Sequence, residues 1–384
     1  MMLAIPLAWL QLIRERVRLL VAVAGITFAV VLMMIQLGFR DALFEAAVML
    51  HRNLNCDVVM ISPQSTNLFA LKSFSRRRLY QVGGIEGVES FTPVYLRLAL
   101  WRNPETRGTR QILIAGIEPE SHPFTLEGVK AQQDLLKKSD VVLFDRLSRP
   151  EFGPVPAWFD QGRVVETELE DRRLTVKGLF SLGASFAADG NLITSDLNFL
   201  RFTPSRSPGL IDLGLITAEA GLSPEILAAR IDAALPDDVM IFTKAGFVQF
   251  EQRYWQTSTA IGFIFSLGSA MGFIVGTVIV YQILYTDVSD HLAEYATLKA
   301  MGYRNRYLFG VVIQEAIILS VLGYIPGLLG SMGLYSMTRK ATALPLSMTV
   351  ERGMVVFSLT ALMCLISGAI AMRKVQAADP ADIF

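Results

Sequence analysis

The chain has 384 residues, of which 52% are hydrophobic and 18% are charged, and its formal net charge is zero. A mean hydropathy of +0.43 is too high for an ordinary soluble protein and predicts several membrane spans together with a folded soluble part. The zero net charge, with no basic cluster among aromatic residues, argues against nucleic acid as a partner.

The two cysteines, Cys56 and Cys364, fall in a soluble and an apolar segment, so we expect no disulfide between them. The three histidines, His51, His122 and His291, are scattered along the chain, and no zinc-ligand spacing occurs. We therefore expect no metal site and no cofactor in this chain.

The amino terminus reads as a cytoplasmic interfacial helix over residues 1–18, because Trp9 and Ile13 share an apolar face and Arg14, Arg16 and Arg18 follow. Residues 19–38 form the first predicted transmembrane helix. A cleaved signal peptide is the alternative, but the long apolar run without a clear A-x-A site favours an uncleaved anchor.

Residues 39–258 have soluble composition and predict one extracytoplasmic α+β domain, which could have two lobes. The predicted strands are residues 58–62, 94–101, 111–117, 164–168, 174–180, 213–217 and 239–243. The predicted helices are residues 41–53, 75–82, 196–202 and 223–235. The segment 213–243 reads as a β-α-β unit and residues 102–109 as a hairpin tip. The proline-rich residues 149–159 read as a loop or a boundary between lobes.

A helix over residues 245–258 is expected to lead into the second transmembrane helix, residues 261–284. Gly268, Gly272 and Gly276 recur there at every fourth position, which lets another helix backbone approach closely. Their spacing fits a dimer interface and internal packing equally well, and both remain open at this point.

Residues 286–307 form a predicted cytoplasmic segment whose centre reads as an amphipathic helix over residues 289–301. Asp287 or Ser289 is the expected amino-terminal cap, and Gly302 the carboxyl-terminal stop. So short a helix is marginal alone in water and needs a surface: the membrane, its own spans or a partner. At this point a helix that meets a partner protein and a simple connecting loop with some helix in it remain equally open.

The third predicted transmembrane helix covers residues 308–335, and a short outer loop follows over 338–352. The fourth predicted transmembrane helix covers residues 354–372, and residues 373–384 form a cytoplasmic tail. Glu315 lies one to two turns into the third helix. A carboxylate deep in a membrane should face protein, water or a basic partner, although one near the edge can extend its charge to the surface.

Basic residues favour cytoplasmic placement of both termini and of residues 286–307. The predicted fold class is thus a multi-pass α-helical membrane protein with four transmembrane helices and a large extracytoplasmic domain between the first and second. No G-x-x-x-x-G-K-[ST] sequence or other catalytic motif occurs, so we expect no catalytic residues, and ATP energy would enter through a separate subunit.

The sequences EYATLKAMGYRNRYL and IQEAIILSVLGYIPGLLG resemble the loop and third helix of the FtsX-like, MacB-type permeases of ABC systems. Stretches over nearly the whole chain, such as FDRLSRPEFGP, GLFSLGASFAADGNLITSDLNFLR and RKVQAADPADIF, resemble more narrowly the DevC-type permeases of cyanobacterial glycolipid exporters.

This resemblance implies a homodimer in the bacterial inner membrane with two copies of a cytoplasmic ABC ATPase that binds ATP and Mg²⁺. A periplasmic membrane-fusion adaptor would dock on residues 39–258 and lead to an outer-membrane channel, with a lipid-like substrate such as a glycolipid. The resemblance places the ATPase contact on the short cytoplasmic helix, at Asp290, His291, Glu294, Tyr295, Leu298 and Lys299.

Two other functions compete with export. One is an FtsX-like mechanotransducer, in which ATP turnover moves the outer domain to regulate a periplasmic partner without transport. The other is a stand-alone sensor or membrane enzyme, which would need a catalytic pair or signalling domain that the sequence does not show.

Overall fold

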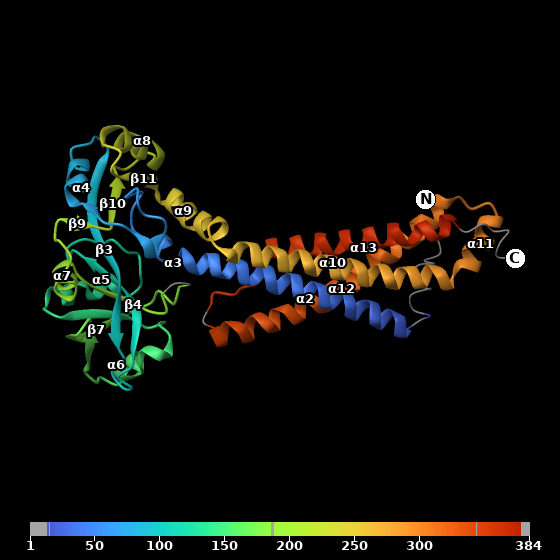
Figure 1. The fold of residues 1–384 in the computed structure, drawn as a ribbon, viewed down its shortest axis with the longest axis horizontal. Helices are drawn as coiled ribbons and strands as arrows, with labels where there is room; N and C mark the ends of the chain where they lie inside the picture. Colours follow the sequence, from blue (N-terminus) through green and yellow to red (C-terminus); the bar gives the residue numbers. More distant parts are fainter. Residues whose placement is uncertain (1–13, 15, 186–187, 343, 378–384) are drawn as a thin grey trace. The chain divides into compact units, whose positions relative to one another are not determined.

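The computed structural model describes residues 14, 16–185, 188–342 and 344–377, and the chain divides into two compact units (Figure 1). Unit 1 consists of Met1–Ala42, Ala260–Thr342 and Leu346–Phe384, and unit 2 of Leu43–Thr259 with Ala343–Pro345.

Unit 1 is helical. Its elements are α2 (Arg16–Ala47) as far as Ala42, α10 (Ala260–Asp290), α11 (Leu292–Ala300), α12 (Asn305–Thr342) and α13 (Val350–Ala377). Within the described residues, four helices are long and apolar enough to cross a membrane: Arg16–Ala47, Ala260–Asp290, Arg306–Thr342 and Val350–Met372. The four apolar helices expected from the sequence are present.

The helix boundaries differ from the prediction in several places, and α13 begins at Val350, inside the predicted outer loop. α2 runs unbroken to Ala47, so the expected separate helix over 41–53 is instead the end of α2 followed by α3 (Met49–Arg52). α10 continues to Asp290, which places Asp287 and Ser289 inside it rather than at a helix start. α12 extends to Thr342, into the predicted outer loop.

The predicted interfacial helix over residues 1–18 and the end of the predicted tail lie largely outside the described residues. Residues 16–18 belong to α2, and residues 373–377 continue α13.

Glycines bring the helices of unit 1 into close contact. A Cβ at Gly276 of α10 would come within 2.8 Å of the Ala29 side chain of α2 and 2.5 Å of Met363 of α13. A Cβ at Gly323 of α12 would lie 2.4 Å from Ile26 of α2. Backbones that approach this closely need residues without side chains, so α2 is packed against both α10 and α12.

Unit 2 holds a nine-stranded sheet in the order β11-β1-β10-β3-β4-β8-β5-β7-β6. The strands are β1 (Val58–Ile61), β3 (Val88–Arg102), β4 (Thr109–Ile117), β5 (Val141–Asp145), β6 (Val165–Leu169), β7 (Arg172–Phe180), β8 (Asn191–Ser195), β10 (Leu213–Ala218) and β11 (Met240–Thr243). A separate pair joins β2 (Phe74–Ser75) to β9 (Leu210–Ile211).

The sheet closes partly on itself. β6 returns to β3 through the antiparallel pair Trp101–Leu169, so β3, β4, β8, β5, β7 and β6 form a ring. The Trp101 ring is fully buried and its Nε1 donates to Phe152 O at 3.0 Å. An indole that fills the interior and still finds an acceptor is a favourable core residue.

Helices and short turns cover this sheet: α4 (Arg76–Val82), α5 (Val129–Gln132), α6 (Val155–Asp160), α7 (Asp196–Phe202), α8 (Pro224–Ala234) and α9 (Lys244–Thr257), with 3₁₀ turns at Leu68–Ala70, Gln133–Lys137 and Pro150–Phe152. The expected loop over 149–159 therefore contains a 3₁₀ turn and α6, because proline is accepted in a first helical turn. The prediction also missed β5 and β8, which are two of the strands that form the ring.

The predicted unit over 213–243 is present as β10, α8 and β11. Both strands pair antiparallel with β1, which lies between them. Ser223 caps α8 by accepting from Glu225 N, with Pro224 at the first helical position, as its sequence predicts.

Candidate functional site

The junction of α10 and α11 carries a group of charged and polar side chains that we call the Arg18 cluster: Arg18, Asp287, Asp290, His291 and Glu315. Arg18 of α2 forms ion pairs with Asp290 and, at 3.6 Å, with Asp287 of α10. His291 Nδ1 lies 2.9 Å from Asp287 O, where the break between the two helices occurs. The cluster thus ties α2 to the end of α10.

Glu315 of α12 is fully buried beside this group, and Asp287 is close enough to act on it electrostatically. Among the described residues, neither carboxylate oxygen of Glu315 has a hydrogen-bond partner. The sequence left open whether this acid faces protein or the membrane edge. The structure places it among protein side chains, next to the predicted cytoplasmic segment.

α11 lies against unit 1 through one face. Tyr295 is only 1% exposed and packs into the same core as Val288 and Leu308. Gly302 ends the helix with φ +93°, and Tyr303 N donates to Leu298 O at 3.1 Å. This 6→1 bond is the carboxyl-terminal stop that the sequence predicts at Gly302.

The six predicted ATPase-contact residues therefore divide. His291 and Tyr295 are buried within unit 1 and are not surface residues of this chain. Glu294 is exposed, the Asp290 carboxylate is half exposed, and Leu298 is partly buried. The side chain of Lys299 lies outside what the structure describes.

Two exposed residues that the prediction passed over extend the free face of α11. Met301 is 63% and Tyr303 45% exposed, on either side of Gly302. Together with Glu294 and Thr297 they form what we call the α11 surface. In the sequence, the large side chains of Met301 and Tyr303 on either side of the predicted helix stop at Gly302 could have identified the α11 surface.

The three glycines of α10 face residues of the same chain. A Cβ at Gly268 would meet Gln36 and one at Gly272 would meet Met33, both on α2. With the contacts of Gly276 described above, the spacing is accounted for by internal packing, one of the two alternatives that the sequence left open.

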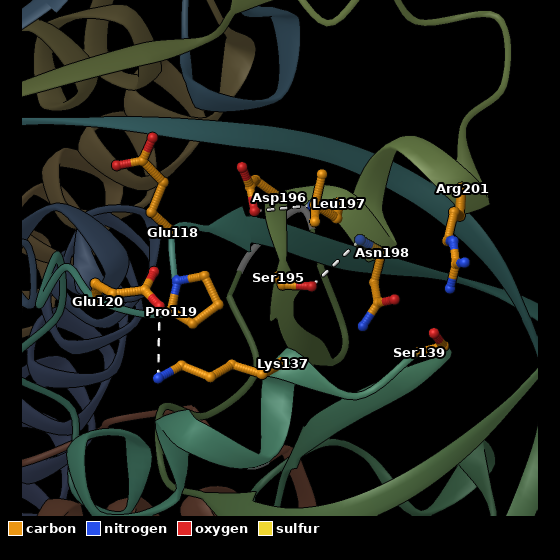
Figure 2. Close-up of a pocket in the computed structure, with 10 residues that line it drawn as sticks. All are labelled: Glu118, Pro119, Glu120, Lys137, Ser139, Ser195, Asp196, Leu197, Asn198 and Arg201. Carbon is orange, nitrogen blue, oxygen red and sulfur yellow. Dashed lines mark hydrogen bonds and ion pairs between the residues drawn. The ribbon is translucent and has the colours of Figure 1, made fainter.

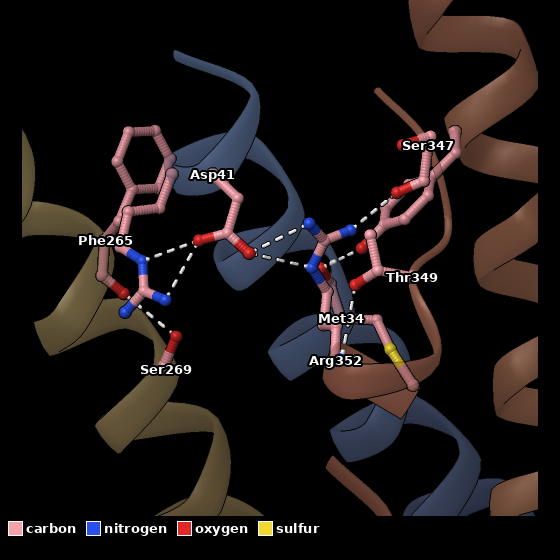
Figure 3. Close-up of polar contacts among 9 residues, drawn as sticks. Met34, Asp41, Phe265, Ser269, Ser347, Thr349 and Arg352 are labelled. Atoms are coloured by element: carbon pink, nitrogen blue, oxygen red, sulfur yellow. Dashed lines mark hydrogen bonds and ion pairs between the residues drawn. The ribbon is translucent and has the colours of Figure 1, made fainter. Parts of the chain in front are cut away.

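A second polar group, the Arg352 cluster, joins the far end of α2 to α13 (Figure 3). Arg352 Nη2 donates to Asp41 Oδ2 at 2.8 Å and its Nη1 to Ser347 O at 2.8 Å, while Arg40 Nη2 donates to Asp41 Oδ1 at 3.0 Å. Arg352 also lies over the ring of Tyr335, whose hydroxyl donates to Met34 O.

The two clusters are separated along α2 by the distance from Arg18 to Asp41, about 35 Å at the rise of an α-helix. A bilayer has a hydrocarbon core about 30 Å thick. α2 is therefore fixed by ion pairs at the two ends of a membrane-length segment and packed against glycines between them.

In unit 2, a polar pocket of about 700 Å³ lies beyond the carboxyl ends of β4 and β8 (Figure 2). Its walls carry both signs of charge, from Glu118, Glu120, Lys137, Asp196 and Arg201. Burial raises the pKa of Glu118, which the Arg76 guanidinium partly opposes, and burial likewise raises the pKa of Asp196. The prediction missed this pocket because it missed β8.

A buried contact between two polar side chains joins α3 to α9 in unit 2. His51 Nε2 lies 3.5 Å from Glu251 Oε2, and both side chains are fully buried. Glu251 also accepts hydrogen bonds from Leu68 N and from Trp255 Nε1, both at 2.8 Å. A buried carboxylate with this many donors is a fixed structural element.

Comparison with known proteins adds to this geometry. Residues 248–380 match the family model described as FtsX-like permease C-terminal. The matched residues hold α10, α11, α12 and α13, so this part of the chain is similar to the carboxyl-terminal part of FtsX-like permeases. No curated protein matches the chain.

Solved structures that resemble it weakly include the following two. The extracellular domain of the noncanonic ABC-type transporter YknZ from Gram-positive bacteria has a TM-score of 0.33 and 12% identity, over 49% of this chain and 100% of that domain. The periplasmic region of MacB from Actinobacillus actinomycetemcomitans has a TM-score of 0.34 and 11% identity, over 52% of this chain and 94% of that one.

Proposed function

We propose that this chain is the membrane subunit of an ABC-type transporter whose ATPase is a separate cytoplasmic subunit. The observation that carries the proposal is the match of residues 248–380 to the FtsX-like permease C-terminal family. The α11 surface is the docking point for the ATPase. It combines apolar side chains, Met301 and Tyr303, with the charge of Glu294, a mixture suited to a protein interface.

Movement of the ATPase reaches the spans through contacts already described. Tyr295 is buried in the core of unit 1, so a push on α11 is transmitted to its neighbours by side-chain packing. Arg18 passes the movement of α10 to α2 through Asp287 and Asp290. α2 then leads directly into unit 2, whose first residue is Leu43.

The finer parts of the proposal rest on the sequence resemblance. Two copies of the chain form a homodimer in the inner membrane of a bacterium, as in DevC-type systems of cyanobacteria. Both termini and α11 lie in the cytoplasm, and unit 2 lies in the periplasm. There it contacts a membrane-fusion adaptor that leads to an outer-membrane channel. The substrate is lipid-like, such as a glycolipid, and ATP with Mg²⁺ binds to the ATPase alone.

Affinity purification of the tagged chain from its native membranes tests the docking point. Wild type should retain a protein with ATP-hydrolysing activity, identified by mass spectrometry. The double variant Glu294→Lys/Met301→Glu should retain at least about tenfold less, the loss expected when central interface residues are replaced. Glu351→Lys, an exposed glutamate in the first turn of α13, is the matched control and should retain it fully. Equal ATPase recovery from all three proteins would refute the proposal.

Export and mechanical regulation differ in what unit 2 contacts. Crosslinking from exposed positions of unit 2 in intact cells should capture an adaptor if the complex exports a substrate. Capture of an envelope hydrolase, with no adaptor, would replace export by the mechanotransducer alternative.

A further inference from the structure

An apolar groove runs between α12 and α13 within unit 1. It has a volume of about 390 Å³ and is lined by Tyr324, Leu328, Met332, Met348, Val350, Met354 and Phe357, among others. The lining is open to the surroundings, since Met332 is 49%, Met354 61% and Phe357 39% exposed. In helices long and apolar enough to span a membrane, these surroundings are lipid chains.

The α12 side of the groove is a short stripe of three side chains. Tyr324, Leu328 and Met332 are spaced by four residues and lie on successive turns, in a row inclined to the helix axis. Arg339 follows Met332 by seven residues, close to two full turns, so it lies on the same side of α12 about 10 Å further along the axis. Lys340 is the next residue. The stripe is thus followed by two cations in the last turn of the helix.

These two cations are available to a ligand. Arg339 and Lys340 are exposed in the last turn of α12, and within the described part of the chain neither has an ion-pair partner. Arg352 is different, because its guanidinium is buried and already bound to Asp41 and Ser347 O. The free positive charge at this end of the groove therefore belongs to Arg339 and Lys340.

We propose that the groove is a binding site for one anionic phospholipid of the surrounding bilayer. One acyl chain lies along the stripe between α12 and α13, and the phosphate group lies at Arg339 and Lys340. An apolar groove of about 390 Å³, followed along α12 by two exposed cations, is complementary to a lipid with an apolar chain and an anionic headgroup. The lipid would fill the space between the two helices and stabilise their packing. This site needs neither the ATPase nor a transported substrate.

Tryptophan quenching by brominated lipids tests the site on the full chain reconstituted in phosphatidylcholine vesicles. Phe357→Trp places a reporter in the groove, and Phe263→Trp, at a position 68% exposed on α10, is the matched reporter on an open lipid-facing surface. The four native tryptophans give the background, measured on wild type. Brominated phosphatidylglycerol and brominated phosphatidylcholine are then titrated separately.

At Phe357→Trp, phosphatidylglycerol should compete for the site at least about fivefold better than phosphatidylcholine, the factor expected for one basic residue near an anionic lipid. At Phe263→Trp the two lipids should quench equally. Arg339→Gln/Lys340→Gln should abolish the preference in the groove, and Arg339→Lys should keep it. Should Phe357→Trp fail to fold, Met354→Trp reports on the same groove. Equal quenching by both lipids in the groove, or a preference unchanged in the double glutamine variant, would overturn the proposal.

Discussion

At the scale of single residues, the buried charges of unit 2 are held by specific partners. Glu251 is fully buried and accepts hydrogen bonds from Leu68 N and Trp255 Nε1, with His51 3.5 Å away. Such a carboxylate contributes mainly by satisfying donors that would otherwise be buried without an acceptor.

Replacing Glu251 by alanine should therefore be costly. Each of the two donors would be left without its acceptor, at about 1–3 kcal/mol apiece, so we expect a loss of about 2–6 kcal/mol. Denaturant unfolding of the purified protein measures it. Glu251→Gln keeps one acceptor oxygen and should lose less, and Glu89→Ala, at an exposed position, should change stability by less than about 0.5 kcal/mol. A small effect of Glu251→Ala would mean that water replaces the carboxylate.

Asp196 and Asp160 should affect stability in opposite directions as the pH changes. Burial raises the pKa of Asp196, so the folded state binds this proton more tightly than the unfolded state does. Its stabilising effect is present below the ordinary pKa and is lost as the pH rises through the raised value. Hydrogen bonding to Arg146 lowers the pKa of Asp160, so its contribution is instead lost as the pH falls.

Thermal unfolding midpoints measured as a function of pH check this difference. Asp196→Asn should reduce the decrease in stability on going above pH 3.8, the ordinary value for this group. Asp160→Asn should reduce the decrease on going below it. Identical pH profiles for the two variants would contradict the assignment.

At the scale of elements, glycines decide how closely the helices of unit 1 pack. Gly276 lies where α10 meets α2 and α13, whereas a Cβ at Gly333 of α12 would meet no atom within 4 Å. Substituting alanine at each position therefore distinguishes the effect of a close helix contact from the general effect of adding a methyl group to a helix.

Gly276→Ala should destabilise the protein by about 1–3 kcal/mol, the range for overpacking a close contact. Gly333→Ala should be neutral or slightly stabilising, because alanine favours the helix and nothing opposes its methyl group. Thermal unfolding in detergent compares the two. If Gly276→Ala stabilised as much as Gly333→Ala, the close contact would not limit the packing.

The length of the apolar runs was sufficient to predict the four long helices. Capping residues were sufficient to predict the start of α8 at Ser223 and the end of α11 at Gly302. β5 and β8 escaped prediction because VVLFD and NLITS are short and buried on both faces, so neither shows alternation. The burial of His291 and Tyr295 depends on what α11 packs against, and spacing within a helix carries no such information.

At the scale of the whole molecule, α2 links the proposed ATPase contact to unit 2. Arg18 fixes it to α10, and Asp41 fixes it to Arg352 of α13. Under the proposed function, the Arg18 contact transmits movement while the α11 surface binds the ATPase. Binding and transmission can therefore be separated by mutation.

Arg18→Ala should leave ATPase co-purification unchanged but abolish the coupling of ATP hydrolysis to movement of unit 2. Site-specific fluorescence labels on unit 2, read with and without ATP, measure that movement in the reconstituted complex. The exchange Arg18→Asp/Asp290→Arg should restore part of it, since the pair is re-formed with reversed charges. Full movement in Arg18→Ala would show that α2 receives its motion elsewhere.

The ring of strands in unit 2 also affects how the protein is made. Trp101 of β3 pairs with Leu169 of β6, and β8 joins β4 to β5, so the ring cannot close until the chain has been synthesised past β8. Pairing between residues so far apart in sequence is slow, and until it forms both edges can pair with other chains. Newly made protein should therefore be prone to aggregate before ring closure, and a chaperone that shields β3 and β6 should raise the yield of folded protein.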